Sequence, residues 1–109
     1  MSAVGAILAR DAGAAIALEA EDHRHDLERA ISKAARTYPL FTSDQVWGLL
    51  LERGVSDLDH PNALGAAFLV ASRAGIIVNT GRVQKSSRTP GRRRAIAIWR
   101  SLIFKDPTQ

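Results

Sequence analysis

Apolar residues recur at helical spacing along the chain as far as Gly75. The segment Val4–Ala20 is rich in alanine, which favours helix. A second stripe recurs at intervals of three or four residues: Leu27, Ile31, Ala34 and Tyr38. Asp22 is the expected N-cap of this second helix, and Pro39 is expected to end it. Two separate helices and one bent helix over residues 3–37 both fit the pattern.

A third helix is expected after a short extended segment, Leu40-Phe41. Thr42 or Ser43 supplies its N-cap, and Gly54 ends it. Asp44 falls in the first turn, where the helix dipole favours an acidic side chain. The residues on its apolar face are Val46, Leu49 and Leu50.

A fourth helix is predicted over Asn62–Ala74, after a loop at residues 55–60. Pro61 stands at its start, where the missing N–H is harmless, and Gly75 stops it. The stripe expected to face the core is Leu64, Ala67, Phe68 and Ala71. The stripe expected to face outward is Asn62, Ala66, Leu69 and Arg73.

The hydrophobic pattern changes to that of β-strands after this helix. Residues 76–83 are rich in β-formers, and Ala95–Trp99 forms a matching return strand. Between them, Gln84–Gly91 is polar and contains Pro90-Gly91, a strong loop signal. The sequence therefore predicts a mainly α protein with a C-terminal β-hairpin. The apolar segment 102–104 is expected to pack back on the body.

A chain of 109 residues has room for one domain. We expect a helical extension at residues 1–21, the main domain at 22–104 and a frayed tail at 105–109. The lack of cysteine excludes a disulfide scaffold and a thiol nucleophile. No run of about 18 apolar residues is present, and the N-terminus lacks signal-peptide features. These observations predict a soluble, cytoplasmic protein.

Positive charge is concentrated near the C-terminus. Residues 81–100 hold seven basic side chains and no acidic one, although the net charge of the whole chain is only +4. The rest of the chain holds eight basic and eleven acidic residues, a net charge of −3. A cluster of one sign repels itself, so an anionic partner is the favoured explanation. The alternative is a solvated loop that only keeps the protein soluble.

The order helix, extended segment, helix, helix, hairpin resembles the winged helix-turn-helix family of DNA-binding domains. The likeness covers residues 22–102. Three motifs resemble the small winged-helix proteins of actinobacteria and their phages: Phe41–Trp47, Asn62–Ala66 leading into Ala74–Ile77, and Ile96–Arg100. In that family the helix before the hairpin enters the major groove, and the hairpin is the wing that touches the DNA backbone. The resemblance implies Asn62–Ala74 for the first role and Arg82–Arg94 for the second.

Candidate DNA contacts follow from these roles and from side-chain chemistry. Asn62 can pair with adenine, and Arg73 with guanine or phosphate. The basic and hydroxyl side chains of the wing can reach phosphate oxygens. The wing candidates are Arg82, Lys85, Ser86, Ser87, Arg88, Arg92, Arg93 and Arg94. The resemblance implies a regulatory or phage factor with no cofactor, acting in transcription, excision or replication.

Leu69 and Val70 depart from the family pattern, because related sequences tend to be basic there. Exposed aliphatic pairs often contact a partner. The alternative function is therefore a protein-interaction module, or a homodimer, that uses Leu69, Val70 or the N-terminal helix. An ordinary extra core contact fits the two residues equally well.

Other candidate chemistry is weaker. His23 and His25 lie two positions apart and point about 200° apart on a helix, which is a poor arrangement for a metal site. Trp47 and Trp99 can stack on bases, but packing within apolar surroundings is favoured for both. The sequence has no phosphate-binding glycine loop and no catalytic triad arrangement, so we expect no enzyme activity.

Overall fold

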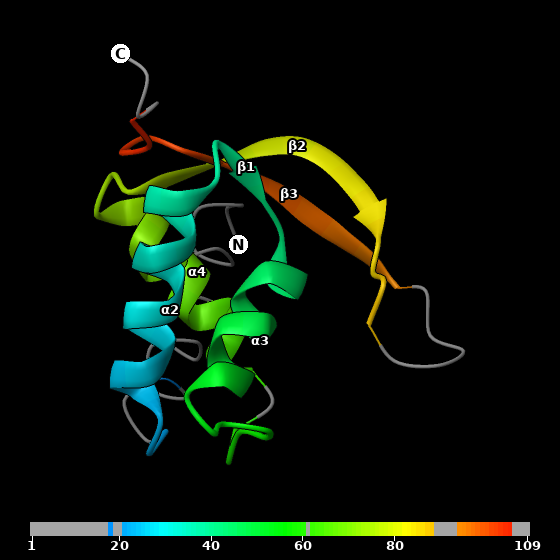
Figure 1. Ribbon diagram of the computed structural model, residues 1–109. Coiled ribbons are helices and arrows are strands. Elements are labelled where there is room, and N and C mark those ends of the chain that lie inside the picture. The colour runs from blue at the N-terminus through cyan, green and yellow to red at the C-terminus, as the bar shows by residue number, and fades with distance from the viewer. Residues whose placement is uncertain (1–17, 19–20, 61, 89–93, 106–109) are drawn as a thin grey trace, which may run out of the picture.

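Three helices and a three-stranded antiparallel sheet form the described part of the chain, which is residues 18, 21–60, 62–88 and 94–105 of the computed structural model (Figure 1). In chain order these are α2 (Arg24–Thr37), β1 (Leu40–Phe41), α3 (Ser43–Glu52), α4 (Ala63–Arg73), β2 (Ile77–Lys85) and β3 (Ala95–Ser101). The expected order of elements from residue 22 onward is confirmed. The expected N-terminal helix lies outside the described residues, apart from the buried Leu18.

The sheet has the order β1-β3-β2, so β3 is its central strand. Phe41 pairs with Trp99, and Ile77 pairs with Ser101. Gln84 and Lys85 continue the ladder of β2, where the sequence predicted a turn. The architecture is mixed α and β rather than mainly α, because the hairpin strands are longer than expected and Leu40-Phe41 adds a third strand.

Strand β2 contains an irregularity that the sequence analysis did not predict. Three residues of β2, 80–82, lie opposite the single residue Ile98 of β3. Gly81 has a φ of 78°, which a residue with a Cβ adopts only with strain. The Thr80 hydroxyl donates to the Ile98 carbonyl oxygen at 2.8 Å. Such a bulge bends the strand and increases its twist, and β2 is visibly curved in Figure 1.

The core lies between the helices and one face of the sheet. Phe68 of α4 stacks on Trp99 with ring centroids 5.2 Å apart, and it also contacts Phe41 at 6.2 Å. The largest fully buried apolar side chains are Leu27, Ile31, Val46, Leu50 and Ile77. The packing role predicted for Trp99 is therefore confirmed, as is the burial of Phe68.

The start of α2 differs from the prediction that Asp22 is its N-cap. His23 occupies the cap position and makes no side-chain cap bond. The carboxylate of Glu21, only 4% exposed, accepts from the backbone N–H of His23 at 3.1 Å and of His60 at 2.8 Å. One carboxylate thus ties the start of α2 to the loop before α4.

The end of α2 also corrects the predicted stripe. Leu27, Ile31 and Ala34 are buried as expected, but Tyr38 is extended and 39% exposed. Pro39 disfavours the helical conformation of the residue before it. The helix therefore ends at Thr37, and Tyr38 turns away from the core stripe.

Helix α3 begins with a capping box. The Thr42 hydroxyl accepts from the Asp44 N–H at 3.1 Å, and the Gln45 side chain accepts from the Thr42 N–H at 2.8 Å. These bonds satisfy backbone donors that a helix start leaves unpaired. Thr42 is therefore the cap, which leaves the side chain of Asp44 available for another contact.

Helix α4 buries a broader face than the predicted stripe. Ala66, expected to face outward, is 2% exposed because the small alanine side chain fits against neighbouring core residues. Leu64 is only half-buried. Leu69 and Val70 are 39% and 40% exposed, so the alternative that they are ordinary core contacts is wrong.

Candidate nucleic-acid interface

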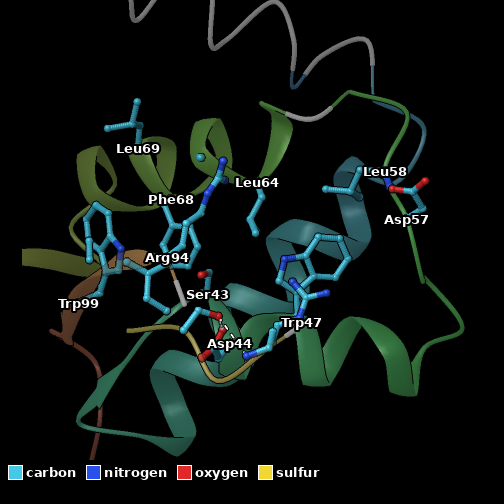
Figure 2. A pocket seen from close by; sticks show the side chains of 15 residues that line it. Ser43, Asp44, Trp47, Asp57, Leu58, Leu64, Phe68, Leu69, Arg94 and Trp99 are labelled. Atoms are coloured by element: carbon cyan, nitrogen blue, oxygen red, sulfur yellow. Dashed lines mark hydrogen bonds between the residues drawn. The ribbon is translucent and has the colours of Figure 1, made fainter. Parts of the chain in front are cut away.

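An open groove of about 770 Å³ lies between α3, α4 and the hairpin (Figure 2). Trp47 and Trp99 stand on opposite sides of it, and Phe68 and Leu64 of α4 lie between them. Its polar lining includes Asp44, Asp57, Arg88 and Arg94. The groove brings together residues from both elements that the sequence analysis assigned to DNA binding.

The basic residues of the hairpin are spread along an exposed projection. The outer parts of β2 and β3 extend past the three helices (Figure 1), and Ser86, the residue after β2, is hydrogen-bonded to Asp44 at the start of α3. Arg82, Lys85 and Arg94 are exposed. The candidates Arg92 and Arg93 lie outside the described residues. The described part of the hairpin thus exposes the basic side chains of Arg82, Lys85 and Arg94 to solvent, and neither β2 nor β3 contains an acidic residue.

Ser86 and Ser87, predicted as phosphate contacts, instead donate to the carboxylate of Asp44. The Ser86 hydroxyl donates to Oδ1 at 2.6 Å. The backbone N–H of Ser87 donates to Oδ2 at 2.8 Å, and its hydroxyl donates to the same oxygen at 3.1 Å. Both carboxylate oxygens are therefore engaged by the segment that follows β2.

These contacts set the protonation of Asp44. Partial burial raises the pKa of its carboxyl group, but the hydrogen bonds from Ser86 and Ser87 and the charge of Arg88 together outweigh that effect. The net result is a pKa below the ordinary value of 3.8. Asp44 is therefore ionised at neutral pH and keeps its hydrogen-bond acceptors.

Arg88 also points into the protein rather than away from it. Its guanidinium lies 4.3 Å from the centroid of the Trp47 ring, at cation–π distance. Its backbone N–H donates to the Ser86 hydroxyl oxygen at 3.2 Å. Trp47 is half-buried and packs against the core, as predicted, with Arg88 over its ring.

The candidates on α4 lie far apart. Asn62 occupies the cap position and Arg73 is the last residue of the helix, which separates them by about 16 Å along the axis. Asn62 is exposed and makes no cap bond with its side chain. Between them the exposed positions include Gly65, Leu69 and Val70. The exposed face of α4 therefore has polar ends and an apolar centre.

The acidic and histidine residues around the start of α2 serve local structure. Asp26 accepts from Arg53 at 2.8 Å, linking α2 to the C-cap of α3, and lies 3.4 Å from Nδ1 of His23. The hydrogen bond from Arg53 is the main reason that the pKa of Asp26 is lowered. Within the described ranges, no group of three His, Cys, Asp or Glu side chains is placed to hold a metal ion.

Comparison with known proteins adds no relative. No family model, curated protein or solved structure matches this chain. Among the described residues, no helix combines the length and hydrophobicity needed to cross a membrane.

Proposed function

We propose that this chain is a winged helix-turn-helix protein that binds duplex DNA. The element order and the sheet order β1-β3-β2 support this assignment. In such a domain α3 and α4 are the two helices of the helix-turn-helix, and the hairpin of β2 and β3 is the wing. The segments that resemble the family map onto the start of α3, onto α4 and onto β3.

The segregation of charge onto the hairpin carries this proposal. All seven basic residues of segment 81–100 lie within or between β2 and β3, and the remaining sequence has a net charge of −3. A duplex carries one negative charge per about 1.7 Å of its axis, so a projecting array of cations gains affinity by releasing counterions. The rest of the protein has a net negative charge and repels the duplex, so DNA binds on the side of the hairpin.

The apolar centre of α4 supports weak sequence discrimination. Base readout needs hydrogen-bonding side chains at the groove floor. On α4 these are Asn62 and Arg73 at the two ends, whereas Leu69 offers only apolar contact with a thymine methyl group. Binding through the backbone therefore dominates, and affinity depends strongly on salt.

A second candidate function is protein binding through α4. The observation that favours it is the exposure of two aliphatic side chains on that helix, Leu69 and Val70. Exposed apolar patches often mark interaction sites. In this case the basic hairpin meets an acidic surface of the partner.

The test is a titration of the protein into a labelled duplex of about 20 base pairs of random sequence, between about 50 and 300 mM salt. Neutralisation of four or five phosphates predicts a log–log slope of roughly −4 to −5. Absence of binding at the lowest salt concentration contradicts the DNA-binding proposal and favours the protein-interaction function.

A further inference from the structure

We infer that Asp44 is a positioning residue that clamps the loop end of the hairpin, just after β2, to α3 and so fixes the direction of its basic residues. For DNA binding this inference rests on the function proposed above. The clamp itself is a property of the fold and is testable without DNA. We call the contacts of Asp44 with Ser86 and Ser87, together with the stacking of Arg88 on Trp47, the hairpin clamp.

The hairpin needs such an attachment because the core does not hold its outer half. Only Ile77 of β2 is buried, and every residue from Asn79 to Lys85 is exposed. The bulge at residues 80–82 interrupts the regular ladder at the point where burial ends. Beyond that point the hairpin is supported by the hydrogen bonds between β2 and β3 and by the contacts that its loop end makes with α3.

The contacts of Asp44 supply that support. Its two carboxylate oxygens accept three hydrogen bonds from two consecutive residues, at 2.6, 2.8 and 3.1 Å. The backbone N–H of Ser86 donates to the Arg94 carbonyl oxygen at 2.7 Å. Holding Ser86 therefore also holds the residue before β3, so both strands are attached at once.

Trp47 provides the second half of the clamp. Asp44 and Trp47 are three residues apart in α3, so their side chains lie on the same face of the helix. The segment 86–88 runs along this face, with Ser86 and Ser87 hydrogen-bonded to Asp44 and the Arg88 guanidinium over the Trp47 ring. Two adjacent attachment points resist rotation of the hairpin better than one.

A fixed hairpin presents its exposed cations as an ordered array. The side chains of Arg82, Lys85 and Arg94 do not contribute to the clamp, so they remain on the exposed surface. Ordering a binding element before association reduces the entropy lost on binding. The clamp therefore raises DNA affinity without itself touching DNA. Its loss lowers affinity but leaves the number of neutralised phosphates unchanged.

The experiment uses two clamp variants and a matched control. Asp44→Ala removes the acceptor, and the double variant Ser86→Ala/Ser87→Ala removes two donors without changing the charge. Asp57→Ala is the control because Asp57 lines the same groove and carries the same charge, but bonds only to its neighbour Leu58 among the contacts of the described residues. Thermal melting confirms that each variant is folded before it is titrated.

Both clamp variants are expected to bind duplex DNA about 5- to 20-fold more weakly, with an unchanged salt slope. Asp57→Ala is expected to bind as well as the unmodified protein or more tightly, because a negative charge leaves the groove. Asp44→Ala loses the same charge, so a fall in its affinity cannot come from electrostatics alone. Equal or tighter binding by both clamp variants overturns the inference, and so does a flatter slope, because it shows that the variants lose contacts between cations and phosphates rather than only the order of the hairpin.

A second measurement tests the clamp without DNA. In the unmodified protein, the Ser87 amide is expected to exchange slowly with solvent, and heteronuclear NOE values at residues 84–88 to match those of the helices. In Asp44→Ala the exchange of this amide is expected to accelerate and the NOE values at residues 84–88 to fall, while the core residues keep their values. If the unmodified protein does not bind DNA, the proposed function fails and this measurement alone decides on the clamp. Unchanged exchange and NOE values in the variant overturn the clamp whatever the DNA result.

Discussion

Glu21 shows how one buried carboxylate can organise two elements. It is 4% exposed and accepts from two backbone N–H groups that lie on different segments, at His23 and His60. Both hydrogen bonds go to Glu21 and not to its neighbour Asp22, whose side chain is shorter. A bond between segments 39 residues apart in sequence constrains where the loop enters α4.

Glu21→Ala should therefore destabilise the protein by about 1–3 kcal/mol, because it leaves buried backbone donors without an acceptor. Urea denaturation measures the change. Asp22→Ala is the control, since Asp22 is exposed and such substitutions stay within about 0.5 kcal/mol. Equal losses for the two variants would contradict the role given to Glu21.

Phe68 is the central aromatic residue of the core. Phe68→Ala removes a ring that contacts both Phe41 and Trp99, and the expected loss of stability is about 3–5 kcal/mol. Leu69→Ala at the neighbouring exposed position is the matched control and should cost far less. A loss below about 1 kcal/mol for Phe68→Ala would show that α4 is rotated differently about its axis.

The protonation of Asp44 gives a prediction for acid conditions. Its pKa in the folded protein lies below the ordinary value of 3.8, so its contribution to stability is complete above that value. The contribution is lost as the pH falls through the lowered, folded-state pKa. Between about pH 5 and pH 2, the unmodified protein should lose more stability than Asp44→Ala does. Unfolding free energies of the two proteins across this range provide the measurement, and parallel curves would contradict it.

At the scale of elements, the sequence predicted the features that residues close together in the chain determine. A cap at Thr42 or Ser43, the buried positions Leu27, Ile31 and Ala34 of α2 and the order of the elements along the chain follow from spacing and turn chemistry. The burial of Ala66 did not follow, because alanine fits either face of a helix and only its neighbours decide. The pairing of Asp44 with Ser86 spans 42 residues, and no signal within either segment indicates it.

Helix α4 separates the two candidate functions. Leu69→Arg/Val70→Arg adds two charges to an exposed face, so the domain should stay folded. If this helix faces DNA, affinity rises and its salt dependence steepens. If the pair anchors a protein partner or a second copy, the added charges are desolvated without partners and assembly is lost. We expect the first result. DNA titration with light scattering tests it, and loss of a dimer without a gain in affinity contradicts it.

The hairpin is expected to supply the salt dependence. Replacing Arg82, Lys85 and Arg94 with alanine should weaken binding to all duplexes and flatten the salt slope by about 3, since each phosphate contact contributes about 0.9. Folding should change little because all three side chains are exposed. Titration over the same salt range measures the slope. An unchanged slope would show that these residues do not contact the backbone.

At the scale of the whole molecule, positive and negative charges are segregated along the chain. Ten of the eleven acidic residues precede β2 in sequence, and Glu21, Asp26 and Asp44 among them accept hydrogen bonds from other segments. The sequence alone predicted this segregation, because it is a matter of order along the chain. The groove was not predicted, because it forms only when α3, α4 and the hairpin come together.

The bulge of β2 has a consequence for how copies of the protein behave towards one another. In the described sheet β2 and β1 are the edge strands, and an edge with regular free N–H and C=O groups invites a strand from another molecule. β1 is only two residues long, and the edge of β2 is broken at residues 80–82 and carries the charged Arg82 and Lys85. A strand from another molecule therefore finds no long, regular edge to pair with on either side of the sheet. The same irregularity that bends the hairpin protects concentrated protein against growth of the sheet from chain to chain.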